Sequence, residues 1–203
     1  MDYNLYSLFC VPVLEADLKV SSEVINYIHT LEYNRTDYNN ADISIRKDIL
    51  EDPFFEDYSQ QIDILVREFV FEISKFDEEN VALERVASWC NRHHYSDWSH
   101  DHTHYNSFVS GVWYLETSEK CGDLNVHSPH NGFGLPLDHS KTEYNQYNSH
   151  SWTLPSVQNR IYIFPSTLRH SVCKNESEDI RSSIAFNYYA RGILNTEDNF
   201  IYS

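Results

Sequence analysis

Apolar side chains recur at helical spacing in two parts of the first 80 residues. After Ser21, a residue type that commonly caps a helix, apolar residues stand at positions 24, 25, 28 and 31. A longer pattern follows Asp52-Pro53, which has the form of a cap with proline at the first helical position. It predicts an amphipathic helix over residues 54–76 that packs on a flat surface. The apolar stripe of this helix consists of Ile62, Leu65, Val66, Phe69, Val70 and Ile73.

Two weaker signals occupy the rest of this region. Residues 5–14, LYSLFCVPVL, predict a short apolar strand that is broken by Pro12. The polar stretch from Asn34 to Asp42 predicts a loop.

From about Val81 the periodicity becomes that of short strands, in which alternate side chains share a face. The segments with this pattern are residues 81–94, 108–116, 123–129, 160–165 and 181–190. Many short strands after two helices indicate a mainly β fold, with a closed or sandwiched antiparallel sheet and helices outside it. We expect one domain over residues 1–203, with 1–80 as a helical support region and 81–203 as the strand-rich core. The polar segment 130–155, rich in His, Asn and Tyr, predicts a loop over a site or a lid.

Composition narrows the range of functions. The chain has five glycines and neither a Walker A sequence nor a dinucleotide-binding fingerprint, which argues against a phosphate-binding loop. A formal net charge of −16 repels phosphate backbones and argues against nucleic-acid binding as the main role. The four cysteines form no CxxC pair, so we expect reduced thiols. With no signal-peptide pattern and no apolar run of membrane-spanning length, we expect a cytoplasmic protein without membrane contact.

The most informative chemistry lies in HDHTH, residues 100–104. In an extended segment His102 and His104 point to the same side, so both rings can enter one cavity. His170, far along the chain after the turn FPS, can add a third imidazole. Imidazoles gathered on one face can bind iron and leave positions open for other ligands. His100 and His102 have the same spacing and form the alternative pair.

A polar strand face follows the third histidine. Along RSSIAFN, Arg181 shares one face with Ser183 and Asn187, whereas Ile184 and Phe186 lie on the other. A polar face this close to a histidine cluster indicates the wall of a pocket. The planar guanidinium of Arg181 can hold a carboxylate through two parallel hydrogen bonds, and Ser183 can donate to the same group.

The ordered set of segments resembles the iron(II)/2-oxoglutarate-dependent dioxygenase superfamily, and in particular an oxygenase family of bacterial and phage proteins with an H-x-H…SGVYYL core. The matching segments are LFCVPVL near the N-terminus, SWCN (88–91), HTHYNSFVSGVWYL (102–115), CGDL (121–124), FPSTLRHSV (164–172) and RSSIAFN (181–187). The chain departs from the superfamily's common H-x-D/E pattern, because a histidine stands where the carboxylate would be. Such a site lacks one negative charge, although three imidazoles can still bind iron.

The resemblance implies a double-stranded β-helix, or jelly roll, of about eight strands with N-terminal α-helices packed on one sheet. It also implies that Fe(II) is held by His102, His104 and His170. Arg181 and Ser183 would then bind the 5-carboxylate of 2-oxoglutarate. The implied reaction is an O2-dependent oxidation, most simply hydroxylation of an organic or protein substrate, with succinate and CO2 as products.

Other polar and aromatic residues have less specific interpretations. Asn91 and Tyr114 complete the candidate cofactor-binding set. Asn91 either orients bound ligands or satisfies backbone groups, and for Tyr114 a place in the core is the stronger interpretation. Trp89 and Trp113 are likewise expected in the core. We expect solvated or lid positions for His127, His130, His139 and His150.

Two alternative functions remain from sequence alone. The same fold could be a non-catalytic, metal-binding or structural jelly roll, although such a protein needs no carboxylate clamp like Arg181. A three-histidine dioxygenase could also bind its substrate directly to the metal, without 2-oxoglutarate.

Overall fold

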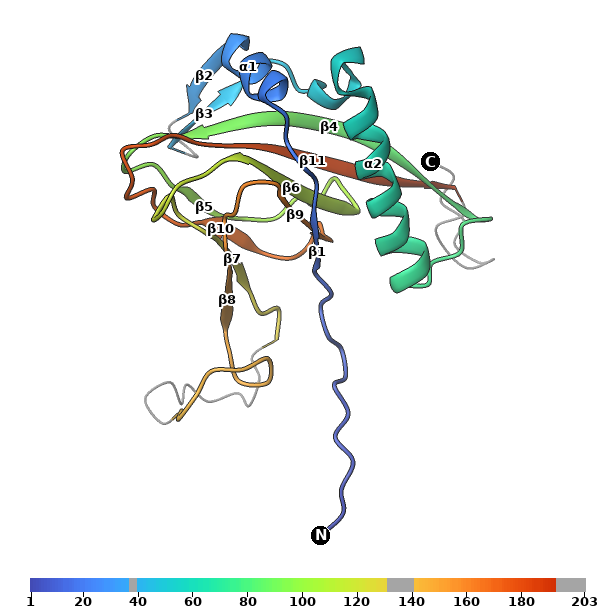
Figure 1. The fold of residues 1–203 in the computed structure, drawn as a ribbon. Coiled ribbons are helices and arrows are strands. Elements are labelled where there is room, and N and C mark those ends of the chain that lie inside the picture. The colour runs from blue at the N-terminus through green and yellow to red at the C-terminus, as the bar shows by residue number, and fades with distance from the viewer. Residues whose placement is uncertain (37–39, 131–140, 193–203) are drawn as a thin grey trace.

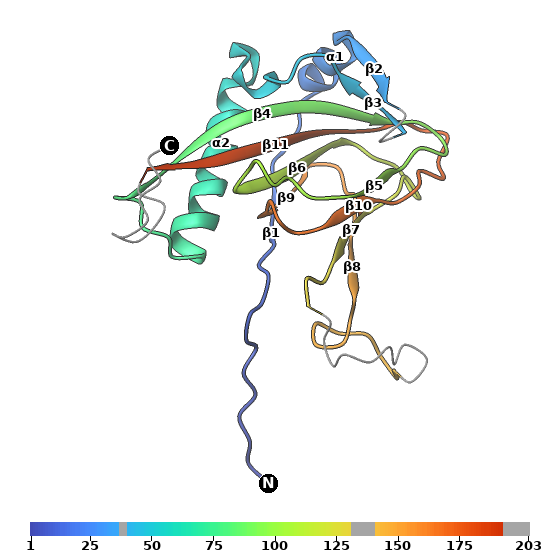
Figure 2. The ribbon, with the colours of Figure 1, turned by 180° about the vertical axis from the view of Figure 1, so that it is seen from behind.

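The computed structural model describes residues 1–36, 40–130 and 141–192 of the 203-residue chain. Its strands form two antiparallel sheets, and the helices lie outside the larger one (Figure 1). The view from behind shows the same layers, with α1 above β4 and the smaller sheet on the other side (Figure 2).

The larger sheet contains seven strands in the order β1-β9-β6-β11-β4-β3-β2. These strands are β1 (Leu14–Asp17), β2 (Tyr33–Thr36), β3 (Ala41–Ser44), β4 (Val81–His93), β6 (Val109–Glu116), β9 (Arg160–Pro165) and β11 (Arg181–Gly192). The smaller sheet has the order β5-β10-β7-β8. Its strands are β5 (Ser99–His102), β7 (Leu124–His127), β8 (Ser151–Leu154) and β10 (His170–Val172). The predicted jelly-roll fold is confirmed, with more strands in the described residues than the eight expected.

The helices begin where the sequence predicts. α1 (Ser22–Thr30) is capped by the Ser21 side chain, which accepts from the backbone N–H of Val24 at 3.4 Å. Asp52 caps in the same way, accepting from the N–H of Phe54 at 3.0 Å. The helices that follow α1 are the 3-10 helices Ile49–Glu51 and Pro53–Phe55, α2 (Glu56–Arg67) and a π-helical stretch, Glu68–Ile73.

The π-helical stretch changes which side chains face the sheet. A π-turn holds more residues than an α-turn, so the apolar face shifts after Glu68. Phe71 is therefore buried, although the helical spacing did not include it. Ile73, which the spacing assigned to the packed face, is 52% exposed.

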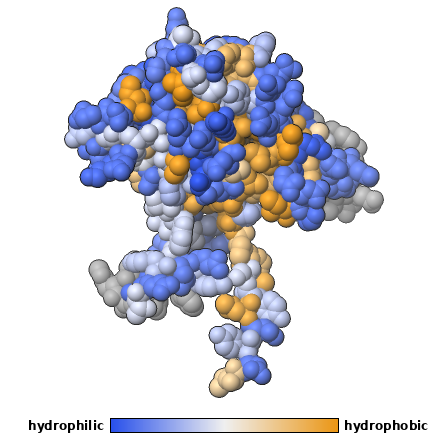
Figure 3. Space-filling model, in the orientation of Figure 1, coloured by the Kyte–Doolittle hydropathy of each residue, from blue (hydrophilic) through white to orange (hydrophobic). Residues whose placement is uncertain are grey.

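The strand predicted over residues 5–14 is wrong for most of its length. Pairing begins only at Leu14, where β1 runs antiparallel to β9. The preceding residues form no strand, and their apolar side chains, such as Leu5 and Phe9, are exposed. In Figure 3 this apolar segment extends below the body of the molecule.

The loop predicted from Asn34 to Asp42 is also wrong, because parts of β2 and β3 lie there and pair with each other. A polar side chain of this edge hairpin binds a residue far along the chain. Arg35 holds Asp97 through two hydrogen bonds of 2.5 and 2.6 Å, and Asp97 is buried. With β1, β2 and β3, the region before residue 81 contributes strands to the larger sheet as well as helices.

Apolar clusters lie on both sides of the larger sheet. The cluster beneath the helices includes Trp113, Ile184 and Phe186, so the core position predicted for Trp113 is confirmed. The cluster between the sheets consists of Tyr114, Leu124, Val126, Tyr162, Phe164 and Leu168. Among the described residues, no helix is long and apolar enough to cross a membrane.

Gly111→Ala should destabilise the fold. A Cβ at this position would lie 2.3 Å from the Phe186 ring and 2.8 Å from the carbonyl oxygen of Tyr162. Overpacking of this kind costs about 1–3 kcal/mol, which urea unfolding would detect as a lower midpoint. Adding Phe186→Leu should restore part of the loss by removing the closest atoms. Equal midpoints for the parent and Gly111→Ala would contradict this packing.

Candidate functional site

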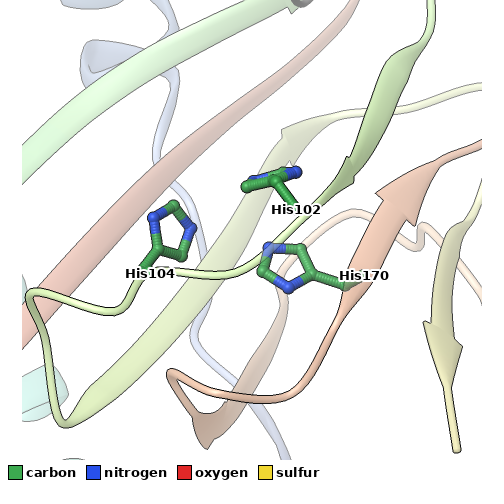
Figure 4. A group of neighbouring side chains, drawn as sticks. All are labelled: His102, His104 and His170. Atoms are coloured by element: carbon green, nitrogen blue, oxygen red, sulfur yellow. The ribbon is translucent and has the colours of Figure 1, made fainter.

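Three histidines converge between the two sheets (Figure 4). His102 ends β5 and His170 begins β10, and the two are direct cross-strand partners. His104 follows β5 on a segment fixed by its own backbone N–H, which donates to the carbonyl of Ser166 at 2.9 Å. One ring nitrogen from each of the three lies within 4.8 Å of the others. The structure thus brings together His102 and His104, as the H-x-H spacing predicts, and adds His170, as the family resemblance implies.

Backbone carbonyls orient two of the three rings. Nδ1 of His102 lies 2.8 Å from the carbonyl oxygen of His100, and Nδ1 of His170 lies 2.8 Å from that of Leu168. A carbonyl can only accept, so each Nδ1 carries the proton and each Nε2 offers its lone pair. Protein metal sites commonly fix the ligating tautomer in this way.

Burial keeps two of these rings neutral. Burial, and then the neighbouring His102, lower the pKa of His104 to about 4. Burial and His102 also lower the pKa of His170 to about 3, although its hydrogen bond to Leu168 acts in the opposite direction. A metal binds neutral imidazole, so at neutral pH no proton has to leave these two rings first.

His100 lies outside this cluster. Its side chain is exposed, and its ring contacts that of Trp98 at a centroid distance of 4.2 Å. Asp101 also points away, toward the outer side of the smaller sheet, where its carboxylate lies 2.9 Å from Nε2 of His127. The alternative pair of His100 and His102 is therefore not the one that the fold assembles.

Arg181 is buried at the end of β11 with an incomplete set of partners. It is 1% exposed, and its Nη1 donates to the carbonyl oxygens of Cys121, at 3.0 Å, and Gly122. Its Nε and Nη2 are buried and contact no acceptor in the described part of the chain. Burial lowers the pKa of Arg181, yet an arginine stays protonated at neutral pH. A buried cation with two unused donors fits a carboxylate.

The remaining candidate cofactor residues form a row across three strands. Ser183 on β11 is the direct cross-strand partner of Asn91 on β4 and of Tyr114 on β6. Directly paired residues point to the same face of a sheet, and Arg181 shares that face two residues earlier. Ser183 and Tyr114 are buried and Asn91 is half-buried. Tyr114 belongs to the cluster between the sheets, in line with its expected core position.

Trp89 departs from its expected core position. It is half-buried on the site-facing side of β4, and its ring lies edge-on to His104 at a centroid distance of 6.0 Å. Its Nε1 donates to Oδ1 of Asn91 at 3.0 Å. His93, two residues beyond Asn91, is buried on the same face and was not predicted as a site residue. The alternation of positions 89, 91 and 93 was the signal that could have found it.

The other histidines differ in their surroundings. His127 is half-buried and paired with Asp101, so its expected solvated position is wrong. His130 and His150 are exposed, as expected. His139 lies outside the described residues. The predicted loop over residues 130–155 ends in β8, which pairs with β7, and its described residues 141–150 lie at the far end of that hairpin (Figure 1).

Comparison with protein families gives a match to the family described as "Putative 2OG-Fe(II) oxygenase", over residues 87–187. The chain belongs to the 2OG-Fe(II) oxygenases. The matched segment runs from β4 to β11 and contains all three clustered histidines and Arg181. As a 2OG-Fe(II) oxygenase, the protein uses ferrous iron and 2-oxoglutarate. Curated proteins give no match to the sequence.

Solved structures share the fold of this oxygenase at low sequence identity. HygX from Streptomyces hygroscopicus, with nickel, 2-oxoglutarate and hygromycin B bound, is 12% identical with a TM-score of 0.60, covering 88% of this chain and 83% of its own. A Pseudomonas putida prolyl-4-hydroxylase is 12% identical with a TM-score of 0.57, covering 90% and 94%. A prolyl hydroxylase from Trichoplax adhaerens, in complex with a hypoxia inducible factor peptide, is 13% identical with a TM-score of 0.54, covering 87% and 83%.

His102→Ala should abolish stoichiometric Fe(II) binding and leave the fold intact, because it removes one of three clustered imidazoles. His100→Ala is the matched control and should bind iron like the parent, since its ring lies outside the cluster. Elemental analysis after anaerobic loading and desalting measures the ratio of iron to protein. Full occupancy in His102→Ala, or its loss in His100→Ala, would place the site elsewhere.

The metal-free protein should lose stability as the pH falls from about 6.5 toward 4. In the unfolded chain a histidine takes up its proton near pH 6.5, whereas folded His104 and His170 do so only near 4 and 3. In this window the unfolded state binds more protons, so each such histidine lowers the free energy of unfolding by up to about 1.4 kcal/mol per pH unit. Urea unfolding of chelator-treated protein at several pH values gives the slope. The slope should be shallower in His170→Gln, and an unchanged slope would contradict the buried, neutral ring.

Proposed function

We propose that this oxygenase is a hydroxylase whose Fe(II) is held by His102, His104 and His170. Arg181 and Ser183 bind the 5-carboxylate of 2-oxoglutarate. The observation that carries the proposal is the buried Arg181 guanidinium with two donors unused. It lies on the same face of the larger sheet as Trp89, whose ring contacts that of His104 in the cluster of three imidazoles. A structural metal site has no use for such a cation.

The donor set suits ferrous iron. Imidazole is a good ligand for iron, and the three rings leave further positions open to other ligands. With histidine in place of the common carboxylate, the protein supplies no negative charge. Two positive charges on the metal and one on Arg181 then favour a dianion, and 2-oxoglutarate is one. Bound together, iron and 2-oxoglutarate supply the oxidising chemistry, in which O2 is consumed and succinate and CO2 are formed.

The residues of the chain bind and orient the cosubstrate, and they exclude water from it. The residues that would hold 2-oxoglutarate form a row on one face of the larger sheet, the cosubstrate track, from Trp89 beside His104, past Asn91 and Ser183, to Arg181. Tyr114, the cross-strand partner of Ser183, belongs to the apolar cluster between the sheets, so the surroundings of this row are of low polarity. A charged hydrogen bond is stronger in such surroundings than in water, so Arg181 fixes the far end of the cosubstrate firmly.

The substrate is an organic molecule or a protein side chain that reaches the histidines from the half-exposed side. His102, His104, Trp89 and Asn91 are all half-buried, whereas His170 and Arg181 are buried. The exposed side of the cluster is therefore where a second molecule can approach the iron. Incubation of Fe(II)-loaded protein with 2-oxoglutarate and O2, followed by measurement of succinate, tests the reaction directly. Equal succinate with and without Fe(II) would contradict it.

Arg181→Ala should weaken 2-oxoglutarate binding by about 30-fold or more and leave Fe(II) affinity nearly unchanged. Truncation leaves a buried carboxylate without its partner, which costs on the order of 2–5 kcal/mol, at about 1.4 kcal/mol per tenfold. Arg181→Lys should recover only part of the loss, because an ammonium cannot form the two-pronged contact. Anaerobic titration of the Fe(II)-loaded protein with 2-oxoglutarate gives the dissociation constant.

Arg191→Ala is the matched control, since Arg191 lies on the same strand but is exposed and paired with Glu84. It should bind 2-oxoglutarate like the parent. Parental affinity in Arg181→Ala would remove the cosubstrate assignment and favour a three-histidine enzyme that binds its substrate directly.

A further inference from the structure

His93 lies beside Arg181 at the far end of the cosubstrate track. The two residues are direct cross-strand partners in the antiparallel pair of β4 and β11, so their side chains leave the same face of the larger sheet. They are 3% and 1% exposed. Two strongly polar side chains are thus buried next to each other on the same face of the sheet.

Both side chains have nitrogens without acceptors. Nδ1 of His93 is buried and unpartnered among the described residues, as are Nε and Nη2 of Arg181. The other ring nitrogen of His93, Nε2, lies 3.0 Å from the hydroxyl oxygen of Ser99. Buried donors in folded proteins almost always have a partner, so three unused nitrogens at one place indicate a missing acceptor.

The role of Nδ1 depends on which nitrogen of the His93 ring carries the proton. Burial, and then the charge of Arg181, lower the pKa of His93 well below its ordinary value, so the ring is neutral and carries one N–H. If the Ser99 hydroxyl donates to Nε2, the N–H is on Nδ1, the nitrogen that lacks a partner. Nδ1 is then a donor, like the two unused nitrogens of Arg181.

We propose that His93 donates a hydrogen bond from Nδ1 to the carboxylate that Arg181 holds. The inference rests on the proposed function, in which that carboxylate is the 5-carboxylate of 2-oxoglutarate. A carboxylate offers about four lone-pair positions and can accept from an arginine and a histidine together. His93 would then discriminate 2-oxoglutarate from 2-oxo acids without a distal carboxylate.

A purely structural role is the competing explanation. Through Ser99 the ring of His93 connects β4 of the larger sheet to β5 of the smaller one, and β5 also carries His102. In that case the important nitrogen is Nε2. The two explanations therefore assign the function to different atoms of the same ring.

Two substitutions separate these atoms. His93→Asn can place an amide N–H near the position of Nδ1 but cannot reach Ser99. His93→Gln can reach Ser99 from the position of Nε2 but has no donor near Nδ1. Dissociation constants are measured anaerobically on Fe(II)-loaded protein for 2-oxoglutarate and for 2-oxobutyrate, which lacks the distal carboxylate. Thermal unfolding midpoints of both variants show whether the fold is retained.

His93→Gln should weaken 2-oxoglutarate binding by about 10-fold or more, as expected for a lost hydrogen bond to a charged group, and leave 2-oxobutyrate binding unchanged. His93→Asn should retain most of the affinity for 2-oxoglutarate. The proposal is overturned if Asn weakens binding as much as Gln, if both ligands weaken equally, or if neither variant loses affinity. Arg181→Ala in the same assay shows whether a negative result counts against the proposed function or only against the role of His93. If it binds 2-oxoglutarate like the parent, the proposed function fails; if it alone weakens binding, only the role of His93 fails.

Discussion

The antiparallel pairing of β11 with β4 on one side and β6 on the other is the constraint on which the rest of the site depends. β11 pairs with β4 along its whole length and with β6 over residues 182–188. Because paired residues point to the same face, this register alone gathers Arg181, Ser183, Asn91 and Tyr114 on one surface. A slip of one residue on β11 would turn Arg181 toward the helices and Ile184 toward the face that now carries Arg181 and Ser183.

In the smaller sheet, strand pairing brings two of the histidines together in the same way. His102 and His170 face each other across β5 and β10, so one strand pair fixes two of the three rings. His104 lies beyond the strand, and its position depends on a contact between layers, its backbone N–H to the carbonyl of Ser166. The hydroxyl of Ser166 contacts that of Ser110 at 2.8 Å, and Ser110 donates to Asn187 on β11 at 2.8 Å. This buried polar chain ties the histidine cluster to the same strand that carries Arg181.

The alternation of side chains along single strands was enough to predict much of the site. The polar face of RSSIAFN and the H-x-H spacing each express a backbone period of two, and both predictions agree with the structure. The errors arose where partners far apart in sequence decide the outcome. Arg35 lies on a strand that pairs with β3 and binds the buried Asp97, and His127 is half-buried with Asp101 as its partner. Ile73 is exposed because the helix changes its hydrogen-bonding period, which apolar spacing does not report.

The hydrogen bonds that orient the rings of His102 and His170 bear on how the site can vary. The acceptors for His102 and His170 are main-chain carbonyls, which every amino acid carries, so substitutions at positions 100 and 168 leave them in place. No such bond to the ring of His104 is found within the described part of the chain; that ring instead lies against the side chain of Trp89. Mutational robustness is therefore uneven across the site. The rings of His102 and His170 are held by main-chain acceptors that a substitution does not remove. The ring of His104 can be redirected by changing one neighbouring side chain, Trp89. Position 89 is therefore the place where a substitution can lead to new reactivity, in evolution or by engineering.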